Sequence, residues 1–106
     1  MDLATITAGM KERVEAKEAF GNTVKFDFGD DGKIHIDGKN GNIVTNDDGA
    51  ADCTLKVTLS DFVDMVEGRL NGMNAFMSGK LKVEGDMSIA MKLQSIIDLN
   101  LRWFKI

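Results

Sequence analysis

Residues 24–36 read Val-Lys-Phe-Asp-Phe-Gly-Asp-Asp-Gly-Lys-Ile-His-Ile, and this stretch decides the class of fold. Its apolar residues alternate with polar ones on both sides of a Gly-Asp-Asp-Gly segment. Alternation with a period of two is typical of a β-strand that buries one face, and glycine with aspartate is typical of a tight turn. The stretch therefore predicts a β-hairpin with one buried and one solvated face.

Three further segments predict strands. Residues 43–45 follow a second turn at residues 39–42, and a polar connection then leads to residues 53–59. Apolar residues alternate with polar ones over 53–59 and again over 81–83. The chain is thus expected to form five strands, four of them before residue 60.

Four segments predict helices. Apolar residues recur at steps of three and four over residues 2–20. Ser60 is a suitable N-cap for a second helix that ends at Gly68. A short helix over 73–78 and a last one from Gly85-Asp86 to residue 94 or beyond complete the set. The order of helices and strands predicts an α+β fold, a sheet covered on one face by helices, in a single domain over residues 1–106.

Composition excludes several classes of protein. The 106 residues are 43% hydrophobic, which is too apolar for disorder, yet no apolar run approaches the roughly 18 residues of a membrane span. The net charge of −4 argues against nucleic acid as a partner. One cysteine, Cys53, excludes an internal disulfide. The start of the chain does not resemble a signal peptide, so a cytoplasmic location is expected.

Catalytic and metal-binding chemistry has little support. His35 is the single histidine and falls on the polar face of its predicted strand, whereas Cys53 is in phase with buried positions. The two Asp-Asp-Gly sequences lack the glutamate that closes a calcium loop. Gly79-Lys80 lacks the spacing and the Ser/Thr of a phosphate loop. We expect no enzyme activity, no metal and no cofactor.

Methionine is the unusual component. Five methionines fall between residues 65 and 91, in the company of Phe62 and Phe76. Methionine fills irregular cores, and it also lines surfaces that accept varied apolar shapes. The last predicted helix carries more apolar residues than one buried stripe needs. Core filling and an apolar ligand pocket both remain open on this pattern.

The stretch Gly-Lys-Leu-Lys-Val-Glu-Gly-Asp-Met-Ser-Ile-Ala-Met-Lys-Leu-Gln at residues 79–94 resembles the signature of the sterol-carrier-protein lipid-transfer domain family. Residues 51–55, 61–62, 68–71 and 75–76 are similar to the same family. The resemblance covers essentially the whole chain. It implies a five-stranded mixed sheet with a crossover between its third and fourth strands, and helices that enclose a hydrophobic tunnel.

The resemblance also implies a function. The family binds fatty acids, fatty acyl-CoA, phospholipids and sterols, so we expect non-catalytic lipid binding and intracellular transfer, with transient membrane contact and a monomer or weak dimer. A protein-interaction or dimerisation module on the same fold is the alternative. An enzyme acting on acyl thioesters would need a nucleophile and a base that the sequence does not pair.

Residue by residue, the resemblance assigns the following candidates. The lipid-binding candidates are Phe62, Met65, Phe76, Met77, Leu81, Val83, Met87, Ile89, Met91, Leu93 and, as the polar residue near the tunnel, Gln94. Phosphates of an acyl-CoA need water or cationic partners outside an apolar tunnel. The headgroup candidates are therefore the lysines of the same region: Lys80, Lys82 and Lys92.

Overall fold

A five-stranded sheet forms the centre of the molecule. The computed structural model describes residues 2–15 and 21–96, without the side chains of residues 13, 72 and 92–96. The strands are β1 (Thr23–Asp27), β2 (Lys33–Asp37), β3 (Ile43–Thr45), β4 (Cys53–Val57) and β5 (Leu81–Gly85). The helices are α1 (Leu3–Val14), α2 (Leu59–Val66), α3 (Gly72–Met77) and α4 (Met87–Ile96), and a 3-10 helix, η1 (Gly29–Asp31), joins β1 to β2.

The sheet is mixed, because one of its four pairings is parallel. The strand order is β3-β2-β1-β4-β5, so β4 pairs with β1 and not with β3. The β1–β4 pairing is parallel and the other three are antiparallel. The chain from β3 to β4 therefore crosses over two strands, and this confirms the crossover implied by the family resemblance.

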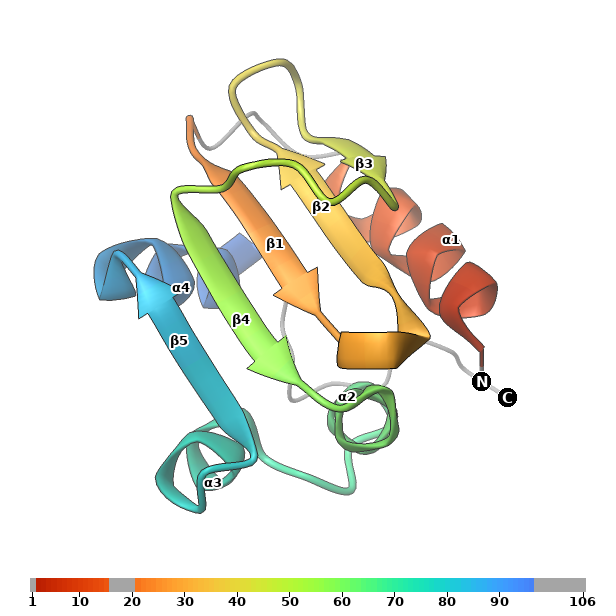
Figure 1. Ribbon diagram of the computed structural model, residues 1–106, viewed down its shortest axis with the longest axis vertical. Coiled ribbons are helices and arrows are strands. Elements are labelled where there is room, and N and C mark those ends of the chain that lie inside the picture. Colours follow the sequence, from red (N-terminus) through yellow and green to blue (C-terminus); the bar gives the residue numbers. More distant parts are fainter. Residues whose placement is uncertain (1, 16–20, 97–106) are drawn as a thin grey trace.

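The alternation of the hairpin sorts its side chains onto two faces. Val24, Phe26, Ile34 and Ile36 are buried. Figure 1 shows α1, α2 and α4 on one side of the sheet, with α3 beside the start of β5, and no helix of the described residues on the other side. The predicted α+β fold with one face covered by helices is confirmed, while an enclosed tunnel between the two layers stays a prediction.

The start of α2 differs from the sequence prediction. Ser60 was expected to cap this helix, with Leu59 in the preceding strand, but β4 ends at Val57 and Leu59 already belongs to the helix. Thr58 has extended backbone angles, and its hydroxyl accepts the Asp61 N–H at 3.1 Å. Threonine is among the residues favoured at N-caps, although serine ranks above it. Phe62, in the first turn of this helix, is buried.

Two other helix boundaries can be compared. The predicted helix over residues 2–20 is present as α1 through Val14, and residues 16–20 lie outside the described part. The short helix predicted at residues 73–78 is confirmed as α3, where the Asn71 side chain accepts from the N–H groups of Met73 and Asn74. The glycine that follows, Gly79, has a φ of 81°, as a left-handed helix end requires.

Candidate functional site

Five of the eleven predicted lipid-binding residues belong to the packed core on the helix-covered side of the sheet or pack against it. Phe62 and Met65 on α2 are 0% and 1% exposed. The Phe62 ring lies 5.2 Å from the centroids of both Phe26 and Phe28, in edge-on and tilted arrangements that aromatic pairs favour. These residues form an aromatic cluster (Phe26, Phe28 and Phe62) between β1 and α2.

The same core continues toward the edge strand. Leu81 on β5 and Ile89 on α4 are buried, and Val83 packs against the core while partly exposed. Leu81 and Val83 are paired in register with Val57 and Leu55 of β4. The strand alternation therefore places these β5 candidates on the helix-covered face, as the sequence predicted.

The other candidates are exposed. Phe76 and Met77 on α3 are 42% and 76% exposed, and Met87 and Met91 on α4 are 45% and 68% exposed. Helices α3 and α4 lie at opposite ends of β5 (Figure 1), so these four side chains form two separate groups. Apolar side chains in water are available for a ligand or a surface to cover.

Three candidates fall on undescribed side chains. Residues 92–94 continue the backbone of α4, which runs to Ile96, but the side chains of Lys92, Leu93 and Gln94 lie outside the described part. Their assignment to the tunnel wall and the headgroup site stays a prediction.

A surface pocket of about 410 Å³ lies at the end of the sheet where β1 and β4 finish and β5 begins. Its lining includes Lys56, Lys80 and Lys82 as well as Phe28 and Val57. Two predicted headgroup lysines, Lys80 just before β5 and Lys82 within it, are thus brought together at one cavity. Sequence analysis missed Lys56, because only the pairing of β4 with β5 places it opposite Lys82.

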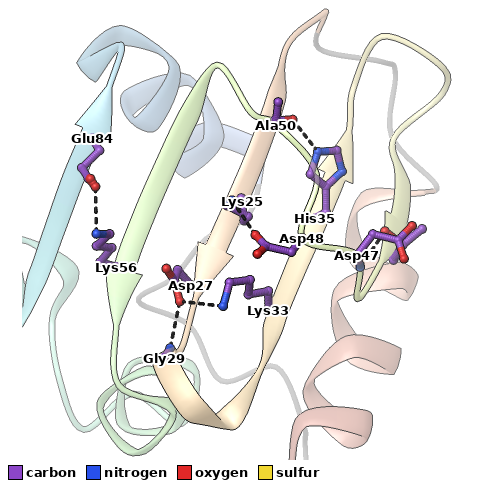
Figure 2. A network of polar contacts seen from close by, with 11 residues as sticks. Lys25, Asp27, Gly29, Lys33, His35, Asp47, Asp48, Ala50, Lys56 and Glu84 are labelled. Atoms are coloured by element: carbon purple, nitrogen blue, oxygen red, sulfur yellow. Dashed lines mark hydrogen bonds and ion pairs between the residues drawn. The ribbon is translucent and has the colours of Figure 1, made fainter.

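The face of the sheet without helices carries a chain of polar contacts (Figure 2). The Nζ atom of Lys25 lies 2.8 Å from Asp48 Oδ1, and the Nζ atom of Lys33 lies 3.4 Å from Asp27 Oδ1. The crossover connection between β3 and β4 supplies Asp48, so this connection is held across the open face. The Lys25 ammonium, by hydrogen bond and by charge, lowers the pKa of Asp48 below its usual value.

Asp27 stands at the border between this open face and the pocket. Its Oδ1 atom accepts the Gly29 N–H at 2.9 Å. This hydrogen bond is the main cause that lowers the pKa of Asp27, and Lys33 acts in the same direction. The carboxylate is therefore ionised and already engaged by two groups.

The two residues that could have supported catalysis have structural roles. The Nε2 atom of His35 lies 3.0 Å from the Ala50 carbonyl oxygen, which can only accept, so Nε2 carries the proton of this hydrogen bond. Cys53 is completely buried, and burial raises the pKa of its thiol, which disfavours the nucleophilic thiolate. The prediction that Cys53 is a buried thiol is confirmed.

Neither a metal cluster nor a membrane-spanning helix is found among the described residues. Residues 2–15 and 21–96 contain no group of three or more His, Cys, Asp or Glu side chains placed to hold a metal ion. Among the same residues no helix has the length and apolar character needed to cross a membrane.

Comparison with known proteins agrees with the fold. The model of the SCP-2 sterol transfer family matches residues 4–98. Human sterol carrier protein 2 is 44% identical over 63 residues, which are 58% of this chain and 12% of that protein. Human hydroxysteroid dehydrogenase-like protein 2 is 46% identical over 48 residues, again 12% of its length. The chain thus matches about an eighth of each of these relatives.

A solved structure extends the similarity to the whole arrangement of helices and strands. The sterol carrier protein domain 2 of Helicoverpa armigera superposes with a TM-score of 0.75 at 27% sequence identity. The superposition covers 91% of this chain and 86% of that one. The sheet order and the helix-covered face are therefore those of a sterol carrier protein domain.

Proposed function

Because the chain belongs to the SCP-2 sterol transfer family, we propose that it binds a lipid without catalysing a reaction and transfers it within the cell. The observation that carries the proposal is the match of the family model over residues 4–98. The proposed cargo is a fatty acid or a fatty acyl-CoA, with phospholipids and sterols as further members of the same ligand class. The single cysteine supports a cytoplasmic setting.

The acyl chain is proposed to lie between the sheet and the helices. The buried candidates Phe62 and Met65 form the inner part of this wall, and the exposed Met87 and Met91 are available to cover it from α4. Burial of an acyl chain contributes about 0.8 kcal/mol for each CH₂ group. A chain of about 16 carbons would thus provide roughly 10 kcal/mol before the loss of its freedom is deducted.

The polar end of the lipid is proposed to face Lys80 and Lys82. Both side chains are exposed, and both line the pocket at the end of the sheet. A charged headgroup keeps its solvation there while the chain is buried. Lys92 and Gln94 remain part of the proposal by sequence alone.

Extraction and thermal unfolding test the proposal together. Mass spectrometry of the protein purified under native conditions is expected to find a fatty acid, an acyl-CoA or a phospholipid at up to one per chain. Delipidated protein should gain thermal stability with palmitate, by about 2.7 kcal/mol at a hundredfold excess over the dissociation constant. Absence of lipid together with no thermal shift would contradict lipid binding. A concentration-dependent dimer in sedimentation would then favour the interaction module.

A further inference from the structure

We propose that Lys56, Lys80 and Lys82 form a binding site for a phosphate group at the end of the sheet. The inference deepens the lipid-binding function, and it rests on that function for the biological source of the phosphate. It adds a residue that family similarity did not assign, Lys56, and a physical reason why the three lysines are placed together.

The first observation is the register of β4 and β5. Lys56 and Lys82 are directly opposite each other in this antiparallel pair, and both are exposed. Like charges directly opposite across two strands repel and destabilise the pairing. An anion placed between the two ammonium groups would turn this repulsion into attraction.

The second observation is that the three lysines differ in whether a carboxylate pairs with them. Glu84 Oε1 lies 2.9 Å from the Nζ atom of Lys56, and this contact raises the pKa of Lys56. In the described part of the chain no carboxylate comes within ion-pair distance of Lys80 or Lys82. Two of the three positive charges are therefore available to an external anion.

The third observation is the cavity between them. The pocket of about 410 Å³ is lined by all three lysines. Phe28 and Val57 also line it, but both are buried, and the strand alternation directs the Val57 side chain to the face opposite that of Lys56. The cavity therefore has room for a phosphate group beside the three lysines.

Asp27 is the opposing charge in the same pocket. Its carboxylate already accepts the Gly29 N–H and pairs with Lys33, so part of its repulsion toward a phosphate is offset. The remaining repulsion between Asp27 and a phosphate means that variants of the site should both weaken and strengthen binding. Loss of a lysine should weaken binding of a phosphate, and neutralisation of Asp27 should strengthen it.

The chemistry recognised is a phosphate ester, and two sources can supply it. One is the free nucleotide part of an acyl-CoA, whose phosphates lie outside any acyl tunnel. The other is the headgroup of a phospholipid in a membrane. Probes for the two sources are coenzyme A without an acyl chain and phosphatidylcholine vesicles that contain phosphatidic acid.

The experiment compares wild type with Lys82→Gln, Asp27→Asn and the control Lys11→Gln. Lys11 is an exposed lysine of α1, on the helix-covered side of the sheet (Figure 1). Binding of pyrophosphate and of coenzyme A is measured by titration at about 50 mM salt, where screening is weak. Lys82→Gln is expected to weaken both by about fivefold, Asp27→Asn to strengthen both, and Lys11→Gln to change neither.

Thermal unfolding of the ligand-free variants gives a second readout. Lys82→Gln removes the like-charge opposition to Lys56, so its melting temperature should equal or exceed that of wild type. If Lys82 only stabilised the fold, the melting temperature of Lys82→Gln would instead be lower than that of wild type. A lower melting temperature with unchanged pyrophosphate binding would overturn the proposal.

Palmitate separates this proposal from the lipid function. Palmitate carries no phosphate, so Lys82→Gln should bind it within about twofold of wild type. If neither wild type nor any variant binds palmitate, the lipid function is contradicted. Equal pyrophosphate affinity in wild type, Lys82→Gln and Lys11→Gln would instead overturn the phosphate site. Co-sedimentation with the vesicles is then compared with the binding of coenzyme A. The comparison shows whether the site prefers a membrane headgroup or a free nucleotide.

Discussion

The two faces of the sheet are built from the same strands and have different physical roles. In β1, Val24 and Phe26 are buried against the helices. The alternating residues Lys25 and Asp27 face the opposite side. The buried face gains stability from apolar area removed from water. The open face consists of partly exposed ion pairs, each worth at most about 1 kcal/mol. The helix-covered face therefore supplies most of the stability, and the charges of the open face contribute little to it.

The largest effect is expected when two adjacent residues of β1, one on each face, are compared. Phe26→Ala removes a fully buried ring that contacts Phe28 and Phe62, and it should lower the free energy of unfolding by about 3–5 kcal/mol. Lys25→Ala, one residue away on the open face, should cost about 1 kcal/mol or less. Urea denaturation measures both. Equal losses would show that the open face contributes as much to stability as the core does.

The next test lies where β5 leaves the sheet for α4. Gly85 has a φ of 94°, and a Cβ atom there would collide with the Asp52 carbonyl oxygen. Gly85→Ala should therefore destabilise the protein by about 2 kcal/mol or more. Gly41→Ala is the control, because Gly41 has a φ of 91° but open space around it. A loss of only about 1 kcal/mol is expected for the control, and equal losses would rule out the collision.

A smaller effect is expected at the start of the helix that covers the core. Thr58→Ala removes the hydroxyl that accepts the Asp61 N–H and should cost about 1 kcal/mol in chemical denaturation. Ser60→Ala should change stability by no more than about 0.5 kcal/mol, since Ser60 lies within the helix and is exposed. The reverse ranking would show that Ser60 is the cap, as the sequence alone predicted.

The smallest effect concerns the charges of the open face. The pKa of Asp27 lies below its ordinary value of 3.8 because its carboxylate accepts the Gly29 N–H. A depressed pKa contributes stability that is present above the ordinary value and is lost as the pH falls through the folded-state value. Wild type should thus lose more stability than Asp27→Asn between about pH 5 and pH 3.

Denaturant midpoints over this pH range check the prediction. Asp30→Asn on the neighbouring exposed turn is the control and should follow wild type. Parallel curves for Asp27→Asn and wild type would mean that the Asp27 hydrogen bond does not persist in solution.

The extent of prediction from sequence differs along the chain. The hairpin was predicted correctly because its alternation is long and is bounded by glycine turns. The start of α2 was misplaced by two residues, because Thr58, Leu59 and Ser60 satisfy the end of a strand and the start of a helix about equally well. The hydrogen bond from the Asp61 N–H to the Thr58 hydroxyl identifies the cap, and it is seen only in the folded chain.

One buried polar side chain had no recognisable signal. Asn42 was predicted as part of a turn, and its φ of 60° agrees with that. The side chain is completely buried, and its Nδ2 atom donates to the Val14 carbonyl at the end of α1, 2.9 Å away. This contact joins residues 28 positions apart, so no local pattern could have indicated it.

The sequence by itself indicated the alternation of buried and exposed residues in the longer strands, the α+β class and the family. These properties follow from local periodicity and from a motif in consecutive residues. Only the tertiary structure decided that Lys56 lies opposite Lys82, and that the methionines of α3 and α4 form separate groups. Strand pairing and the placement of helices join distant parts of the chain. Strand pairing and helix placement depend on which arrangement buries the most apolar surface of the whole molecule. No single segment of the sequence contains that information.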